Sequence, residues 1–105
     1  MAINATGTLL ELCVLAAVAH EDVYGYALTQ LLKERLGVSE STIYPVMRRL
    51  QTQHCLDMYD VPCDGRNRRY YRLTAAGRQQ LDALADEWID FKERIDTILL
   101  KGDGK

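Results

Sequence analysis

The chain has 105 residues, of which 48% are hydrophobic, so it has the size of one small domain and enough apolar side chains for a core. Its formal net charge of −2 argues against a protein that coats nucleic acid without specificity. The three cysteines form no C-x-x-C motif and show no zinc-ligand spacing with the two histidines, so we expect a cytoplasmic protein without a metal or other cofactor.

Positive charge is concentrated in the middle third of the chain. Residues 39–72 carry six arginines against four acidic side chains, whereas the segments on either side are net negative. A local basic patch on an acidic protein suits the recognition of a polyanion through one face.

Residues 8–20 are expected to form the first helix, which opens with a capping box of Thr8 and Glu11. Nearly every residue between 9 and 19 is apolar, so this helix should be buried on all sides, which is hard for so short a chain to achieve within one copy. We therefore expect Leu9 and Leu12 to contact a second copy in a homodimer. The apolar run is too short to span a membrane.

A second helix is expected over residues 24–36, after a turn in which Asp22 serves as the N-cap. Gly37 has the position of a C-cap glycine that ends this helix. A tight turn then leads into a third helix near residues 39–53. Two helices joined by so short a turn, the second with a polar outer face, form a helix-turn-helix.

The third predicted helix has two unlike faces. Apolar side chains at helical spacing are expected to face the core, and these are Ile43, Val46, Met47 and Leu50. On the outer side, Ser41, Arg48 and Thr52 share one stripe. Hydroxyls can contact phosphates or base edges, and arginine can bind guanine through two hydrogen bonds, so this stripe suits the DNA major groove. The alternative is a solvated face with two helix-forming arginines.

A β-hairpin is expected next, with strands over residues 56–59 and 68–73 and a loop over residues 62–67. An Asp64-Gly65 pair provides the turn signal. In the second strand, the phase shared by Tyr71 and Leu73 is expected to face the core.

The tip of this hairpin is basic, and it is formed by Arg66, Asn67, Arg68 and Arg69. A hairpin of this kind after a helix-turn-helix is a wing, which can reach the phosphates or the minor groove beside the recognition helix. The alternative is a solvated turn. Neighbouring arginines repel one another unless something anionic is near, so we favour the wing.

Thr74 is a good N-cap for a last helix over residues 75–100. Apolar side chains spaced three and four residues apart form a heptad seam on it, and these are Leu81, Leu84, Trp88, Phe91, Ile95 and Ile98. A helix of this length is about 38 Å long, too long to be covered by so small a domain. We therefore expect its far half to pair with a second subunit.

Together these elements predict a mainly α fold with a two-stranded β wing. Residues 1–74 are expected to form a winged helix-turn-helix DNA-binding domain. Residues 75–105 are expected to form a C-terminal dimerisation helix followed by a disordered tail.

Three motifs follow one another along the chain: Thr42-Ile-Tyr-Pro, Arg48-Arg49-Leu50, and Arg68-Arg-Tyr-Tyr-Arg-Leu-Thr-Ala-Ala-Gly77. In this order and spacing they resemble the PadR family of bacterial transcriptional regulators, and the resemblance covers about residues 9–100. It implies a winged helix-turn-helix, a homodimer built through the first and last helices, and operator binding, usually as a repressor. The single C-terminal helix is similar to that of the smaller PadR subgroup, and many relatives release DNA when a small aromatic or amphipathic molecule binds.

The chain departs from the family pattern at two positions. His54 stands where relatives usually have the glycine that ends the recognition helix, and we expect it to take a left-handed conformation with some strain. Ser41 stands where a glycine is frequent, and we expect it to alter local DNA contacts rather than the fold.

The expected DNA contacts come from the third helix and from the wing, and they are Ser41, Thr42, Tyr44, Arg48, Arg49, Arg66, Asn67, Arg68 and Arg69. Arg49 could instead pair with an acidic side chain of its own subunit. Two recognition helices in a dimer should lie about 34 Å apart, so the partner is expected to be a double-stranded operator with an inverted repeat. Trp88 has two interpretations, since it could stack on a small aromatic or hydrophobic effector or simply pack in the dimer core.

Other classes of function fit the sequence less well. We expect no enzyme, because the chain shows no nucleophile–base pair, no apolar carboxylate cluster and no phosphate-binding glycine loop. A winged-helix module that binds protein rather than specific DNA is the alternative, and the density of arginines on the third helix and wing favours DNA. A redox sensor through Cys63 is a further alternative.

Overall fold

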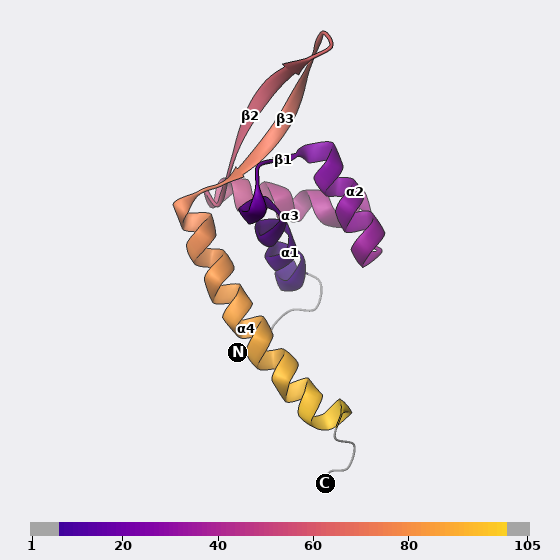
Figure 1. The fold of residues 1–105 in the computed structure, drawn as a ribbon, viewed down its shortest axis with the longest axis vertical. Coiled ribbons are helices and arrows are strands. Elements are labelled where there is room, and N and C mark those ends of the chain that lie inside the picture. The colour runs from indigo at the N-terminus through magenta and orange to yellow at the C-terminus, as the bar shows by residue number, and fades with distance from the viewer. Residues whose placement is uncertain (1–6, 101–105) are drawn as a thin grey trace.

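The structure is a computed structural model that describes residues 7–100. Its elements follow the chain as α1 (Gly7–His20), β1 (Val23–Tyr24), α2 (Gly25–Leu36), α3 (Glu40–Thr52), β2 (Leu56–Cys63), β3 (Arg66–Leu73) and α4 (Ala75–Leu99). The hairpin β2–β3 extends away from the helices at one end of the molecule, and α4 extends away at the other (Figure 1). The predicted winged helix-turn-helix with a long C-terminal helix is confirmed, with a third short strand added to the sheet.

The core lies where α1, α2 and α3 meet. Its fully buried side chains come from all three helices, and they are Val14, Leu15, Leu28, Ile43 and Leu50. The apolar face predicted for the third helix is confirmed, because all four of its members are buried. Helix α3 is thus held to the rest of the protein by one face, which leaves its opposite face accessible.

The predicted capping box at the start of α1 is wrong. The helix begins at Gly7, so Thr8 lies inside it, and the Glu11 carboxylate binds the guanidinium of Arg49 in α3. Glu11 points to the buried side of the helix. A carboxylate there is stabilised more by a charged guanidinium than by the backbone N–H at the exposed end of the helix that a capping box would use.

The predicted N-cap of the second helix is also wrong, and the helix starts one residue later than predicted. Val23 and Tyr24 form a short strand that pairs antiparallel with Tyr70 and Tyr71 of β3. Helix α2 starts at the next residue, so Asp22 does not cap it and instead accepts a hydrogen bond from the Tyr59 hydroxyl at 2.6 Å. The helix ends as predicted, because its C-cap glycine is left-handed with a φ of 67°.

The three strands lie in the order β1-β3-β2. The hairpin is longer than predicted and its loop is shorter, because β2 and β3 continue to Cys63 and Arg66 and leave only Asp64 and Gly65 between them. Both turn residues have positive φ, 52° and 78°, which matches the twist that a two-residue hairpin turn needs. Four residues of the predicted loop therefore belong to the strands.

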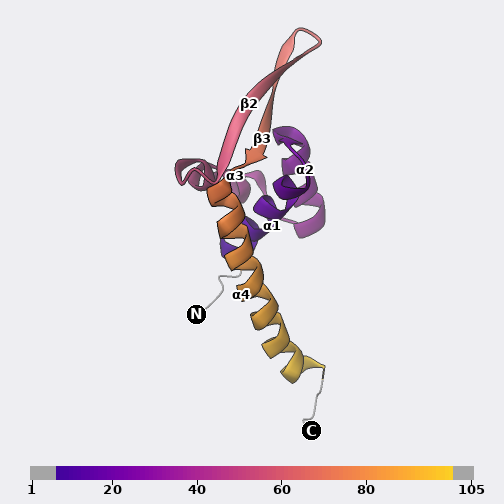
Figure 2. The ribbon, with the colours of Figure 1, turned by 60° about the vertical axis from the view of Figure 1, so that its left-hand side comes forward.

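Helix α4 begins at the predicted N-cap, since the Thr74 side chain accepts a hydrogen bond from the backbone N–H of Gly77 at 2.9 Å. Its first half packs on α1 and contributes Leu81 and Leu84 to the common core. Its second half leaves the domain, as the two ribbon views show (Figures 1 and 2), and Ile98 there is 79% exposed. The boundary at residue 74 between a DNA-binding domain and a dimerisation helix stays a prediction. The predicted tail after residue 101 lies outside the described residues.

Two properties of residues 7–100 limit the kinds of site that they form. No helix in this range is long and apolar enough to cross a membrane. No group of three or more histidine, cysteine, aspartate or glutamate side chains in it is placed to hold a metal ion.

Candidate nucleic-acid interface

The outer face of α3 presents hydroxyls at its start and an arginine near its end. Ser41, Tyr44 and Arg48 are exposed, and Thr42 is half-buried. The Ser39 hydroxyl lies 2.9 Å from that of Ser41 and 3.3 Å from that of Thr42, so three hydroxyls meet at the first turn. The structure therefore brings four of the predicted residues of this helix, Ser41, Thr42, Tyr44 and Arg48, onto one accessible surface.

Arg48 is the free cation of this surface. Among the described residues, no acidic side chain forms an ion pair with it, although six other ion pairs are present. The neighbouring Thr52 hydroxyl is occupied, since it donates to the backbone carbonyl of Arg48 at 3.0 Å. An exposed guanidinium without an acidic partner is available to a phosphate or a base edge.

Both ends of α3 are fixed. At its start, Glu40 forms an ion pair with Lys33 of α2 at 3.1 Å. At its end, the Cys55 N–H donates to the Leu50 carbonyl at 2.8 Å and the His54 N–H donates to the Gln51 carbonyl at 2.9 Å, which is the Schellman pattern. The left-handed conformation predicted for His54 is confirmed by its φ of 61°.

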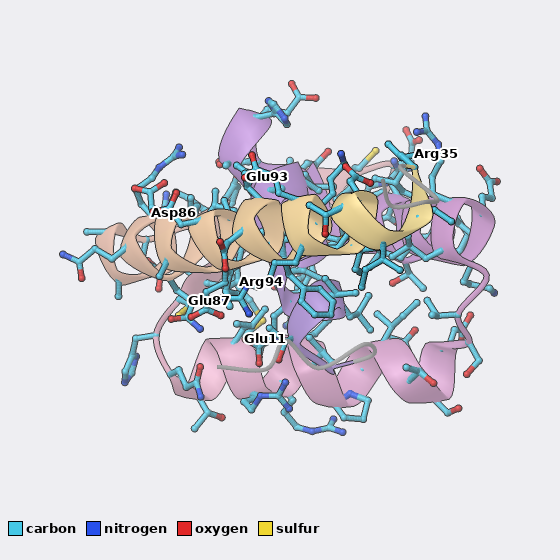
Figure 3. All side chains as sticks on the ribbon, turned by 90° about the horizontal axis from the view of Figure 1, so that it is seen from below. Glu11, Arg35, Asp86, Glu87, Glu93 and Arg94 are labelled. Atoms are coloured by element: carbon cyan, nitrogen blue, oxygen red, sulfur yellow. The ribbon has the colours of Figure 1, made fainter. Side chains whose placement is uncertain are left out.

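Arg49 is not free like its neighbour. Its Nε donates to Oε2 of Glu11 at 2.8 Å, and its Nη2 contacts the same oxygen. The structure therefore shows the alternative stated for Arg49, in which it pairs with an acidic side chain of its own subunit. Viewed from below (Figure 3), the Glu11 side chain lies between α4 and α3.

All four predicted wing residues are exposed, but they do not form one patch. Alternation along β3 places Arg66 and Arg68 on one face of the sheet and Asn67 and Arg69 on the other. The second face is the one that also carries Tyr71, whose hydroxyl receives a hydrogen bond from Gln51 of α3 at 3.4 Å. The recognition helix therefore lies on the side of Asn67 and Arg69.

The opposite face of the sheet carries a ladder of tyrosines and arginines that the sequence reasoning missed. The rings of Tyr24, Tyr70 and Tyr59 follow one another with centroid distances of 5.8 and 5.7 Å. Arg68 lies 4.9 Å from the ring centroid of Tyr24, and Arg72 lies 5.3 Å from that of Tyr59. Cation–π contacts of this kind orient the two guanidinium groups.

Only part of this ladder was visible in the sequence. The shared phase of Arg68, Tyr70 and Arg72 follows from strand alternation. The contribution of Tyr24 depends on β1, and the sequence predicted Tyr24 as the start of the second helix instead. The hydrogen bond from Tyr59 to Asp22 raises the pKa of that tyrosine and ties the ladder to the segment before β1.

The wing arginines consequently differ in the partners that their guanidinium groups have. Arg69 pairs with Asp60 at 3.4 Å, and Arg72 pairs with Asp57 at 3.8 Å. Arg68 stacks on a ring, whereas Arg66, next to the turn, forms no ion pair within the described part of the chain. Arg66 and Arg48 are therefore the two cations of the predicted set that have neither an acidic nor an aromatic partner there.

An apolar groove lies away from this surface, between α1, the turn from α2 to α3, and α4. It has a volume of about 390 Å³ and is lined by Leu9, Leu10, Leu12, Cys13, Leu36, Val38 and Trp88. Burial raises the pKa of the Cys13 thiol, so this thiol stays protonated near neutral pH. The half-buried indole of Trp88 faces an apolar space, which suits a flat hydrophobic molecule or a side chain of a second copy.

Comparison with known proteins gives consistent results. Residues 14–83 match the family described as "Transcriptional regulator PadR-like family". The chain is 34% identical to "Uncharacterized protein X" of Lysinibacillus sphaericus, over 86% of this chain and 87% of that one. It is 40% identical to "Transcriptional regulator Rv3488" of Mycobacterium tuberculosis, over 69% of this chain and 68% of the relative.

Solved structures agree with the sequence comparison. The protein smu.1704 from Streptococcus mutans has a TM-score of 0.85 with 34% identity, and the match covers 100% of this chain and 99% of that one. The PadR-like transcriptional regulator BC4206 from Bacillus cereus has a TM-score of 0.77 with 32% identity, over 92% and 94% of the two chains.

Proposed function

The chain belongs to the PadR-like family of transcriptional regulators, and from that premise we propose that it binds a specific inverted-repeat operator as a homodimer and represses transcription. Its proposed partner is double-stranded DNA, so it works where the DNA lies, which is the cytoplasm in a bacterium. The observation that carries the proposal is the outer face of α3, where exposed hydroxyls share one surface with Arg48, which has no acidic partner among residues 7–100.

In this proposal α3 enters the major groove. Arg48 binds a guanine edge or a phosphate, while Ser41, Thr42 and Tyr44 contact the backbone and base edges near the start of the helix. The wing lies over the adjacent minor groove, where Arg66, Asn67, Arg68 and Arg69 reach phosphates from both faces of the hairpin. The free guanidinium of Arg66, beside the turn, is placed to reach deepest.

The dimer forms through α1 and the later part of α4. Of the six seam positions, Leu81 and Leu84 are already buried in their own chain, whereas Ile95 and Ile98 are 40% and 79% exposed. Leu99 and Leu100 extend this exposed apolar end. Covering these side chains with a second copy removes apolar surface from water, which favours association. We therefore assign the contact to Leu9, Leu12 and the seam from Trp88 onward.

We also propose that the groove beside Trp88 admits a small aromatic or hydrophobic effector that weakens DNA binding. The volume of about 390 Å³ and the apolar lining support this role. The competing assignment is that the indole and the groove are filled by the partner subunit. A winged-helix module that binds protein instead of specific DNA is the second function to test.

Selection from a random-sequence DNA library tests the proposed function without knowledge of the operator. The purified protein should enrich an inverted repeat whose half-sites lie about 34 Å apart, which is one turn of the duplex. Enrichment of no shared sequence over repeated rounds would favour the protein-interaction module.

A further inference from the structure

A buried acidic side chain connects the first helix to the recognition helix. Glu11 is 9% exposed, and Arg49 of α3 donates two hydrogen bonds to one of its carboxylate oxygens. The two residues are 38 positions apart in the sequence. This ion pair therefore joins α1 directly to α3.

The surroundings of Glu11 make its partner obligatory. Apart from Glu11 itself, all side chains from Leu9 to Ala19 are apolar. A carboxylate buried in such a helix is strongly destabilising unless a cation and hydrogen bonds compensate it. Burial raises the pKa of the nearby Cys55 thiol and the Glu11 carboxylate adds to that rise, so Cys55 is a neutral neighbour of Glu11. The position of the Arg49 guanidinium is consequently fixed by α1.

The two adjacent arginines of α3 have different roles for this reason. Successive residues of a helix point about 100° apart, so the side chain tied to Glu11 and the free Arg48 leave the helix in different directions. Holding Arg49 against α1 adds a constraint, beside the buried apolar face of α3, on the rotation of α3 about its own axis. That rotation decides where Arg48 and the hydroxyls of the first turn point.

We infer that Glu11 and Arg49 are positioning residues for operator recognition, and that Arg49 acts through the orientation of α3 rather than as a phosphate contact. The inference rests on the proposed function, because it concerns how α3 meets DNA. It adds an acidic, buried residue to the determinants of binding to a polyanion. It also connects α3 to α1, whose Leu10 and Leu12 line the groove beside Trp88.

Charge and orientation predict opposite changes in operator affinity for Glu11→Gln, which makes the inference testable. If only charge mattered, removing the negative Glu11 would strengthen binding to every DNA. If orientation matters, Glu11→Gln weakens binding to the selected operator, since a neutral amide holds the guanidinium less firmly. Binding to random-sequence DNA depends mainly on charge, so the same substitution should leave it unchanged or strengthen it slightly.

The probes are a duplex selected by the wild-type protein from a random library and a shuffled duplex of the same composition. Fluorescence anisotropy gives the Kd of each for wild type, Glu11→Gln, Arg49→Lys and the double variant. Arg49→Lys keeps the positive charge but loses the two-point contact with Glu11. Because the Arg49 side chain is partly exposed, this variant provides a second test if Glu11→Gln folds poorly. Thermal unfolding establishes that each variant is folded at the temperature of the assay.

The expected result is a loss of about tenfold in operator affinity for each single variant, within the range known for residues that act at a distance. The double variant should lose little more than either single variant, because both substitutions break the same contact. Arg48→Gln is the matched comparison, because it removes a proposed DNA contact directly. Since Glu11 acts partly by aiming Arg48, Glu11→Gln should cost less operator affinity in an Arg48→Gln background than in wild type.

Equal or tighter operator binding by Glu11→Gln overturns the inference, and so does an equal loss on both duplexes. A loss of salt dependence in Arg49→Gln comparable to that in Arg48→Gln also overturns it, because that result would make Arg49 a phosphate contact. If the wild-type protein itself selects no duplex, the proposed function fails before any variant is made, which distinguishes the two failures.

Discussion

Gly77, in the first turn of α4, lies directly against the backbone carbonyl of Cys55, which follows the C-terminal turn of α3. The same junction is held by two hydrogen bonds from Thr74, one from its N–H to the Cys55 carbonyl at 3.1 Å and one from its hydroxyl to the His54 carbonyl at 2.6 Å. The start of the proposed dimerisation helix is therefore attached to the end of the helix proposed to read DNA.

Gly77→Ala is expected to destabilise the protein by about 2 kcal/mol or more, because small-to-large changes in a packed site force the backbone to move. The added Cβ would lie 2.7 Å from Cδ1 of Leu73 and closer still to the Cys55 carbonyl oxygen. Urea unfolding measures the change, with Ala76→Ser at the exposed neighbouring position as a control within about 0.5 kcal/mol of wild type. Wild-type stability for Gly77→Ala would mean that α4 does not approach this carbonyl.

His54→Gly is expected to stabilise the protein by about 0.5 to 1 kcal/mol. A side chain at a φ of 61° is strained, and glycine removes this strain although it also makes the unfolded chain more flexible. The control is Gln53→Gly, where φ is −84° and glycine offers no relief, so this variant should lose stability. Thermal unfolding compares the two, and lower stability for both would contradict the left-handed assignment.

The fold was predictable wherever a local pattern determines the structure. The spacing of apolar residues predicted the buried face of α3, and Thr74 and Gly37 predicted helix boundaries, because each signal acts within one turn. Strand β1 was missed because two residues are too few for a period, and Val23–Tyr24 becomes a strand only by pairing with the edge of β3. The capping box at Thr8 was wrong because a local motif does not contain the distant Arg49.

Trp88 offers a direct test of the proposed effector site, since it is the only tryptophan in the sequence. Planar hydrophobic compounds that enter the groove should quench its fluorescence, because they stack on the indole. Calorimetry should show that Trp88→Leu loses this binding while it remains a dimer, whereas the exposed Glu93→Gln variant keeps it. Absence of quenching across a broad panel would assign Trp88 to the dimer core.

Alkaline pH is expected to destabilise the fold through its two core thiols. Burial raises the pKa of Cys13 and, with help from the Glu11 carboxylate, that of Cys55, relative to the ordinary value of 9.0. The folded state then holds these protons more tightly than the unfolded state. Their contribution to stability is full below about pH 9 and is lost as the pH rises through the raised pKa values.

Urea unfolding at about pH 7.5 and about pH 10.5 measures this loss. The double variant Cys13→Ala, Cys55→Ala should lose less stability between the two pH values than wild type does. The single variant Cys63→Ala, whose thiol lies near the wing turn, should behave like wild type. If the stability of wild type and of the double variant fell by the same amount, the thiols would not be the cause of the loss.

The candidate site was predictable in its helix and only partly in its wing. Arg48 is exposed because helical periodicity places it away from the core, which the sequence alone specifies. The wing arginines are divided between two faces by the register of β2 and β3, and that register follows from the two-residue turn at Asp64. The predicted strand over residues 68–73 already placed Arg68 and Arg69 on opposite faces, but the loop predicted over residues 62–67 left Arg66 and Asn67 undetermined. The ion pair of Arg49 could be weighed only as an alternative.

Specific DNA binding by the surface around Arg48 is the central claim, and fluorescence anisotropy over a series of salt concentrations tests it most directly. A duplex selected by the protein should bind at least about a thousandfold more tightly than a shuffled duplex near physiological salt. Both affinities should fall steeply as salt increases, and Arg48→Gln should weaken operator binding and reduce that slope. Equal, weak binding to both duplexes at every salt concentration would contradict the assignment of this face to operator recognition.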